Sequence, residues 1–374
     1  MYLPDASLDA IDRAVASQQV GPDEMMMILL ADSGHPQLEA LRERLNRRGV
    51  WFFGGVFPGL IADATVRERG ALVTRLPAWM KPQVVRGLDQ RPDAPPELMD
   101  GAPNGRELTA LVFVDGITAN IATFLADLFD RWGGAVHYLG AGAGSLSFKA
   151  APCVFTQDGV FQDAAVVAVA DTGSSIGVRH GWQRLAGPFV ATKTSRNRII
   201  ELNWRNAFEV YREAIQDDSG QLLQKEDFLS VAKSYPLGLL KEGAENVVRD
   251  PVAVTDAGDL VCVGEVPEHA ALDLLKGRPE WLVAAAAQAA ADCQLPRDAT
   301  PRQSLVMDCI SRRLFLNEAI ADEMAAIQRQ MQQAAPGLPL KGALTIGEIA
   351  SYGEGYLEFF NKTVVTGLLY TAPK

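Results

Sequence analysis

Cysteine and histidine are both scarce in this chain of 374 residues, which has four of each. The cysteines, Cys153, Cys262, Cys293 and Cys309, lie far apart and form no Cys-x-x-Cys pair. This spacing excludes a zinc finger and a disulfide framework, and it indicates a reduced protein. The histidines are not clustered either, so the sequence argues against a metal site.

Long apolar runs and clusters of basic residues are also missing. The closest approach to a membrane span, Trp281–Ala291, is mostly alanine and is shorter than the roughly 20 apolar residues that a span needs. The N-terminus lacks the basic-then-apolar pattern of a signal peptide. The net charge of −11 argues against non-specific binding to nucleic acid or to an anionic membrane. We therefore expect a cytoplasmic protein with neither of these partners.

The order of the expected elements indicates an α/β fold. The apolar run Met26–Ala31 predicts a buried strand, a helix opened by Pro36 follows it, and Val50–Phe53 predicts the next strand. This strand–helix–strand order is typical of a parallel α/β unit. A length of 374 residues suggests two domains. We predict two α/β domains, residues 1–217 and 218–374, each a mixed β-sheet packed with helices, with a ligand cleft between them or at strand ends.

Three expected strands of the first domain end in glycine, at Gly54-Gly55, at Asp115-Gly116 and at Gly140–Gly144. Glycine lets backbone amides approach a ligand without a side chain in the way. The alternative is that these segments are only tight turns between strands and helices. The pattern is not that of a dinucleotide site, so a small polar or anionic ligand is favoured. The candidate residues here are Gly54, Gly55, Asp115 and Gly142.

The segment 177–211 combines several signals. His180-Gly181-Trp182 follows a predicted strand, and Gly187-Pro188 precedes a second strand that turns near Asn197. Aromatic residues then recur at helical spacing up to Tyr211. His180 is either a hydrogen-bonded structural histidine or a polar group in a ligand pocket. Trp182 is either a core aromatic or a platform for a ligand.

The second half carries short motifs in a fixed order. They are Tyr235–Gly238, the alanine-rich helix Glu280–Cys293, Cys309 with Arg312, Gly347-Glu348-Ile349, and Asn361 with Thr363. Together with segment 177–211, this order resembles the FIST proteins, with a FIST N and a FIST C part, over nearly the whole chain. The chain departs from the family at Asn203-Trp204, where Asp-Gly is usual, and at Phe360, where histidine is frequent.

The resemblance implies a cytoplasmic sensory module of bacterial signal transduction that binds a small ligand, proposed to be an amino acid or a related metabolite. Such modules accompany histidine kinases, cyclic-nucleotide enzymes or chemoreceptors. This chain carries no such output segment, so we expect a separate partner. A subset of the family binds haem and senses nitric oxide, and here the axial ligand would be His180 or His35. No other cofactor is expected.

The charged motif residues allow two interpretations. Arg312 offers a fork for a carboxylate and Glu348 an acceptor for an ammonium group, which together would suit an amino acid; alternatively, they form structural ion pairs. Cys309, beside Arg312, could have a lowered pKa and act as a nucleophile on a small acid or amide. The sequence thus leaves three hypotheses: a ligand-binding sensor, which is favoured, an enzyme, and a haem-based gas sensor. The candidate ligand site of the second half comprises Cys309, Arg312, Glu348 and Asn361, with His180 and Trp182 from the first.

Overall fold

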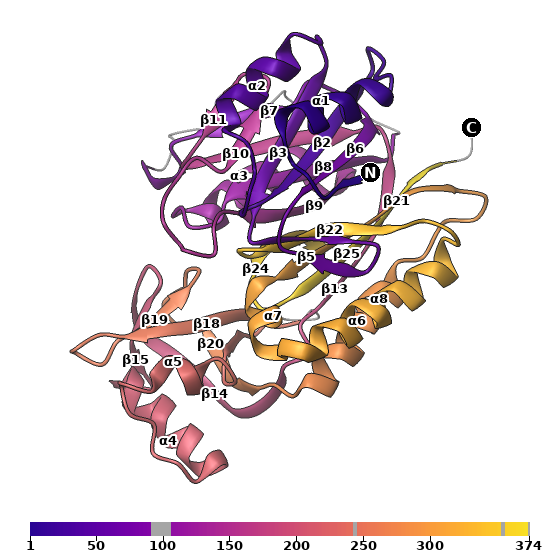
Figure 1. Cartoon of the computed structure of the whole chain (residues 1–374). Helices are drawn as coiled ribbons and strands as arrows, with labels where there is room; N and C mark the ends of the chain where they lie inside the picture. Colours follow the sequence, from indigo (N-terminus) through magenta and orange to yellow (C-terminus); the bar gives the residue numbers. More distant parts are fainter. Residues whose placement is uncertain (91–105, 242–244, 353–355, 373–374) are drawn as a thin grey trace.

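The computed structural model describes residues 1–90, 106–241, 245–352 and 356–372. It contains mixed β-sheets covered by helices, as an α/β fold requires (Figure 1). The described strands form four sheets, and three of these take strands from both the first and the second half of the chain. The two halves therefore fold around each other.

The first sheet is built from the first half alone, in the order β1-β6-β2-β3-β10-β11. Its strands are β1 (Tyr2–Leu3), β2 (Glu24–Ala31), β3 (Trp51–Phe57), β6 (Ala71–Pro77), β10 (Val154–Thr156) and β11 (Gly159–Phe161). β2 and β3 run parallel and are joined by α2 (Leu38–Asn46), which confirms the predicted strand–helix–strand unit. With α1 (Leu8–Ser17), this helix covers the outer face of the sheet (Figure 1).

The second sheet has the order β24-β23-β9-β8-β12-β7. Its strands are β7 (Gln83–Arg86), β8 (Leu108–Asp115), β9 (Val136–Ala143), β12 (Ala164–Ala170), β23 (Glu348–Tyr352) and β24 (Tyr356–Phe360). β8 and β9 are parallel and linked by α3 (Ile121–Trp132), whose apolar stripe packs into the core. β23, from the second half, pairs with β9 and so ties the C-terminal segment to this sheet.

The third sheet has the order β13-β25-β21-β22-β4-β5. Here strands of the first half join a sheet whose centre comes from the second half. Its strands are β4 (Gly59–Ala62), β5 (Thr65–Arg67), β13 (Gly173–Arg179), β21 (Thr300–Cys309), β22 (Leu340–Thr345) and β25 (Val364–Thr371). β4 and β13, both from the first half, pair with β22 and β25 of the second. The helices beside it are α6 (Pro279–Asp292), α7 (Ile310–Leu316) and α8 (Ile320–Ala334).

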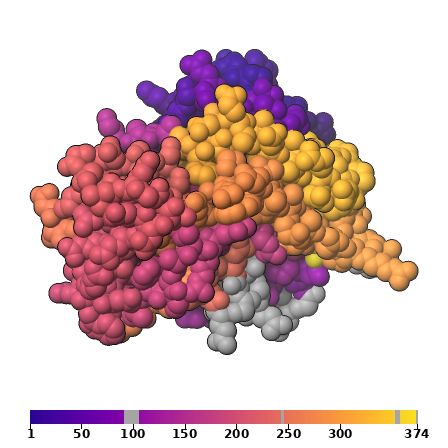
Figure 2. Space-filling view, turned by 90° about the horizontal axis from the view of Figure 1, so that it is seen from below, coloured from indigo at the N-terminus to yellow at the C-terminus, as the bar shows by residue number. Residues whose placement is uncertain are grey.

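The fourth sheet, in the order β14-β20-β17-β18-β19-β15-β16, forms a separate lobe, and Figure 2 shows its magenta and salmon segments beside the orange and yellow ones. Its strands are β14 (Gln183–Ser195), β15 (Arg198–Leu202), β16 (Arg205–Asn206), β17 (Leu237–Leu239), β18 (Val247–Val254), β19 (Leu260–Val263) and β20 (Ala271–Lys276). Its helices are α4 (Ala207–Ser219) and α5 (Phe228–Ala232). α4 runs across the predicted boundary at residues 217 and 218, and that boundary stays a prediction.

Candidate functional site

The polar residues predicted for the site in the second half of the chain, together with His180, lie together where β21 ends and α7 begins. The Arg312 network, as we call this cluster, consists of buried polar side chains from both halves of the chain: His180, Asp308, Cys309, Arg312, Glu323, Thr345, Glu348, Asn361, Lys362 and Thr363. Hydrogen bonds join its parts, since Trp182 Nε1 donates to the carbonyl of Lys362 at 3.0 Å and Cys309 N donates to that of Thr363 at 3.2 Å. The sequence motifs thus identify residues that meet in the fold.

Arg312 is completely buried and uses all five of its N–H donors within the protein. Nε and Nη2 hold the carboxylate of Glu323, on α8, at 3.2 and 2.5 Å. Nη1 donates to the carbonyls of His180 and Lys362 at 2.5 and 3.2 Å, and Nη2 also donates to that of Leu282 at 3.1 Å. This arrangement leaves Arg312 no donor for a ligand carboxylate. Its ion pair is with Glu323 and not with Glu348, and its role in ligand binding stays a prediction.

Asp308 is the second carboxyl group beside Arg312, with Oδ1 3.3 Å from Nε, and both residues are fully buried. Burial, together with the negative charge of Glu323, raises the pKa of Asp308 well above its ordinary value. A neutral Asp308 beside the Arg312–Glu323 ion pair leaves one positive and one negative charge, which is the balance that a dry interior requires.

Glu348, at the start of β23, also favours its neutral form, because burial raises the pKa of this carboxyl to about 8. Oε1 accepts from the Thr345 hydroxyl at 2.6 Å, and Oε2 accepts from Thr363 N at 3.3 Å. The neighbouring Cys309 thiol is buried as well, and burial together with Glu348 raises its pKa. The predicted lowering of the Cys309 pKa is therefore wrong, since burial and the charge of Glu348 outweigh the basic neighbours in sequence.

His180 is buried between β13 and β14 and engages both ring nitrogens with protein groups. Nδ1 accepts from Trp182 N at 2.9 Å, and Nε2 lies 3.4 Å from Oε1 of Glu245. Burial, followed by the charges of Arg312 and Arg179, lowers the pKa of His180 to about 3, so the ring is neutral with its proton on Nε2. A ring held in this way does not fit a haem axial ligand.

His35 lies between β2 and α2, and its Nδ1 is 2.8 Å from the carbonyl of Pro36. Its role as an alternative haem ligand stays a prediction. Within the described ranges, no group of three or more histidine, cysteine, aspartate or glutamate side chains could hold a metal ion.

Trp182 and Asn361 have architectural contacts. The Trp182 ring packs against Phe315, with centroids 4.9 Å apart, and carries the Lys362 ammonium 4.9 Å above it. Asn361 is buried, and its Nδ2 donates to the carbonyl of Val263 at 3.4 Å. These contacts support the interpretation of Trp182 as a core aromatic.

Sequence reasoning missed Lys362, which lies at a left-handed backbone position with a φ of 52°. It is 1% exposed, and its Nζ binds Asp250 at 3.1 Å and the carbonyl of Lys233 at 3.0 Å. The signal was available, because Asn361-Lys362-Thr363 forms a short polar link between the mostly apolar strands β24 and β25. Such a link predicts either a surface turn or a buried ion pair, and only the fold distinguishes them.

Three of the glycines predicted at strand ends, Gly54, Gly55 and Gly142, lie inside strands, which corrects that part of the prediction. β3 continues through Gly54 and Gly55 to Phe57, and β9 continues through Gly142 to Ala143. A Cβ on Gly54 would lie 2.0 Å from the carbonyl oxygen of Ile28, and one on Gly142 would lie 2.0 Å from that of Ile346. These positions are glycine because backbone segments approach closely there.

Asp115 does end β8 as predicted, and it is 3% exposed. Its carboxylate accepts from the backbone N–H groups of Ile117 at 3.3 Å and Asp163 at 2.9 Å, and burial raises its pKa. These bonds fix two turns. The ligand roles predicted for Asp115 and for the three glycines stay predictions.

A cleft of about 610 Å³ lies elsewhere, between the first and the third sheets. We call it the inter-half cleft, because β6 and the segment after β12 form one part of its wall and β21, β22 and β25 the other. Its lining residues are Met1, Gln18, Glu24, Val73, Thr74, Arg75, Leu76, Pro77, Asp171, Thr172, Arg302, Gln303, Lys341, Leu369 and Thr371.

Two features distinguish the lining of the inter-half cleft. The hydroxyl groups of Thr74 and Thr172, each 2% exposed as residues, have no hydrogen-bond partner in the described part of the protein. Two basic side chains are only partly engaged: Lys341 Nζ lies 3.4 Å from Gln303 Oε1, and Arg302 uses Nε on the Thr371 hydroxyl at 2.8 Å. Burial lowers the pKa of Lys341, so an anion beside it would be stabilising.

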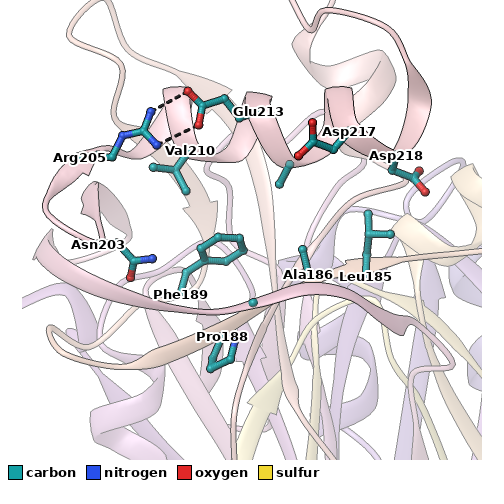
Figure 3. Close-up of a pocket in the computed structure, with 12 residues that line it drawn as sticks. Leu185, Ala186, Pro188, Phe189, Asn203, Arg205, Val210, Glu213, Asp217 and Asp218 are labelled. Atoms are coloured by element: carbon teal, nitrogen blue, oxygen red, sulfur yellow. Dashed lines mark hydrogen bonds and ion pairs between the residues drawn. The ribbon is translucent and has the colours of Figure 1, made fainter.

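A second cleft, of about 670 Å³, lies between β14 and α4 in the fourth sheet's lobe (Figure 3). Phe189 and Val210 point into this β14–α4 cleft, and Arg205 and Glu213 form a two-pronged ion pair at its edge, at 2.9 and 2.6 Å. Its floor is apolar, and the carboxylates of α4 lie along one side.

Comparison with protein families accounts for most of the chain. The FIST N domain model matches residues 26–205, and the FIST C domain model matches residues 207–351. A search of curated proteins gave no match. No helix in the described residues has the length and apolar character needed to cross a membrane. The chain belongs to the FIST family, whose domains are sensory domains of signal-transduction proteins and bind small ligands.

Proposed function

We propose that this protein is a cytoplasmic sensor that binds a small metabolite carrying a carboxylate, an amino acid or a related acid, in the inter-half cleft. It passes the signal to a separate protein, such as a histidine kinase or a cyclic-nucleotide enzyme. Membership of the FIST family supports the sensory role. The position of the site is our inference from the lining of the cleft.

The observation that carries the proposal is the pair of unpartnered hydroxyls on Thr74 and Thr172. A buried polar group without a hydrogen bond costs about 1–3 kcal/mol, so such groups are rare unless they serve a purpose. These two line the same cleft as Lys341 and Arg302, whose side chains supply N–H donors to a carboxylate. Arg312, by contrast, has no free donor in the described part of the protein, because all five of its N–H groups are engaged.

The cleft also contains acceptors for the ammonium group of an amino acid. Glu24 and Asp171 line it, and each forms an ion pair with an arginine. Glu24 lies 3.5 Å from Arg75, and Asp171 lies 3.1 Å from Arg106. Because the wall combines strands of the first and the third sheets, a ligand bound there would contact both at once. Such a ligand shifts the population toward the arrangement of the two sheets that binds it best. A sensor requires this coupling between ligand binding and conformation.

A thermal-shift screen with amino acids and small carboxylic acids tests the proposal. A ligand present at 100 times its Kd adds about 2.7 kcal/mol to the free energy of unfolding. We expect the shift caused by a hit to disappear in Lys341→Met and to shrink in Thr172→Val. Lys193→Met, an exposed lysine on β14, is the matched control and keeps the shift.

Two results would contradict the site. One is a shift that survives both Lys341→Met and Thr172→Val, which would place the ligand elsewhere. The other is a screen in which no carboxylate stabilises the protein while other metabolites do, which would rule out the ligand class.

A further inference from the structure

A tryptophan occupies the tip of the hairpin formed by β15 and β16. Leu202 pairs with Arg205, so Asn203 and Trp204 form a two-residue loop with φ values of 50° and 59°. Asparagine followed by glycine is the favoured sequence for this type of turn, because both positions are left-handed. A bulky side chain at the second position is a backbone outlier, and such outliers point to function.

The indole of Trp204 is also unusually exposed, with 79% of the residue accessible, the largest value among the exposed large apolar side chains of the described residues. The loop that carries it is held in place. Asn203 N donates to the carbonyl of Val190 at 2.9 Å, Asn203 Oδ1 accepts from Val190 N at 2.8 Å, and Trp204 N donates to the Thr192 hydroxyl at 2.9 Å. The hairpin therefore presents an exposed aromatic side chain on a well-fixed loop.

The residues on either side of Trp204, Asn203 and Arg205, line the β14–α4 cleft (Figure 3). The floor of that cleft is apolar, with Leu185, Ala186, Phe189 and Val210 among its lining residues. An exposed aromatic side chain beside an apolar depression is a combination found at protein–protein interfaces.

The charge on α4 indicates what kind of partner fits. Three carboxylates line the cleft, and two of them are neutralised within the chain: Glu213 by Arg205, and Asp218 by Lys276 at 2.6 Å. Asp217 is exposed and has no hydrogen-bond or ion-pair partner in the described ranges. A lysine or arginine of a partner protein would complete this row of ion pairs.

We propose that Trp204 and the β14–α4 cleft form a docking surface for a partner protein. The partner contributes a segment whose apolar side chains fill the cleft and pack on the indole, and whose basic side chain binds Asp217. Tryptophan is the residue type that most often dominates the energy of such interfaces. This surface is separate from the inter-half cleft and goes beyond the proposed ligand binding.

A random-peptide phage library, selected on the full chain without added metabolite, tests the proposal. Recovered peptides should combine apolar residues with lysine or arginine. Their Kd should rise about tenfold or more in Trp204→Gly, which removes the indole while giving the turn its favoured residue, so folding is retained. Asp217→Asn should weaken binding about threefold and reduce its dependence on salt. Leu314→Ala, another exposed apolar residue, is the control and leaves Kd unchanged.

The proposal is overturned if the selection yields no peptide that binds, if the recovered peptides lack basic residues, or if they bind Trp204→Gly as tightly as the original chain. Because no metabolite is present, these results decide the docking surface alone. The screen on Lys341 and Thr172 decides the ligand site.

Discussion

The Arg312 network and the inter-half cleft are both polar and both draw residues from the two halves of the chain, but they satisfy those residues differently. In the network, every N–H of Arg312 has an acceptor and Glu348 is bound by Thr345 and Thr363, whereas the carboxyl oxygens of Asp308 have no hydrogen-bond partner among the described residues. In the cleft, the hydroxyls of two threonines have no partner within the described ranges, although the residues are 2% exposed.

This difference in hydrogen bonding distinguishes groups that stabilise the fold from groups available to bind a ligand. A buried charge without partners costs several kcal/mol, so the hydrogen-bonded Arg312–Glu323 ion pair stabilises one arrangement of the segments it joins. Unpaired hydroxyls on buried residues that line a cleft have a free energy cost that a ligand reaching them can offset. Strongly charged residues with distinctive motifs are therefore not necessarily the ones that bind the ligand.

The largest effect is expected from Arg312→Leu, which breaks the network. It removes five hydrogen bonds and leaves the Glu323 carboxylate buried without its counter-ion. The free energy of unfolding should fall by about 3–5 kcal/mol, measured by urea denaturation. The neighbouring Arg313→Leu is the control and should change it by less than about 0.5 kcal/mol, since among the described residues Arg313 makes a single side-chain hydrogen bond, of 3.4 Å, to the Asn317 carbonyl.

If Arg312→Leu were as stable as the original chain but no longer responded to a ligand, the Arg312 network would be the ligand site and the structural role proposed for it would be wrong. In that case Arg312 would be a binding residue, as the motif first suggested.

Glu348→Gln tests the role of the network through the pH dependence of the free energy of unfolding. The pKa of Glu348 is raised in the folded protein, to about 8, so its stabilising contribution is complete below the pKa of the unfolded chain and is lost as pH rises through 8. The free energy of unfolding should therefore fall between about pH 4.5 and 8, by an amount on the order of a few kcal/mol. Glu348→Gln, which stays neutral, should flatten that decline in denaturation curves taken across this range. An equally steep decline in the variant would show that another group causes it.

A pair of threonine substitutions gives the smallest effect and the closest match in chemistry. Thr345→Val removes a hydroxyl that donates to Glu348 and lies 3.2 Å from the Asp308 carbonyl, so it should cost about 1–3 kcal/mol. Thr172→Val removes a hydroxyl without a partner and should leave the stability unchanged or raise it by up to about 1 kcal/mol. Thermal denaturation of both variants checks the sign of the difference. Equal costs would mean that the hydroxyl of Thr172 is paired in the free protein.

Local pattern was enough to predict the parallel units of the first half. A strand buried on both faces gives a continuous apolar run, as in β2, whereas a helix buried along one stripe gives apolar residues at helical spacing, as in α2. Each pattern therefore predicts the conformation of its own segment. The pairing of β4 with β22 was not predictable, since it joins segments far apart in sequence and depends on both sheets having formed. Gly54 was placed in a turn for a similar reason, because the close approach of Phe155 and β2 is a long-range contact.

The candidate site was predictable only in part. Family motifs identified Cys309, Arg312 and Glu348, which do meet, but residue type alone did not show that their donors and acceptors are already used. Lys341, in β22, and Thr172, between β12 and β13, carry no motif, and lysine and threonine are mostly solvent-exposed residue types. Their significance comes from the cleft, which exists only once the two sheets are packed together.

The position of a bound ligand tests the central claim most directly. A crystal structure of the protein with a carboxylate metabolite from the thermal-shift screen would show it. We predict the carboxylate within hydrogen-bond distance of Lys341 Nζ or the Arg302 guanidinium, with the Arg312–Glu323 ion pair unchanged. A carboxylate bound by Arg312, with Glu323 displaced, would contradict this account.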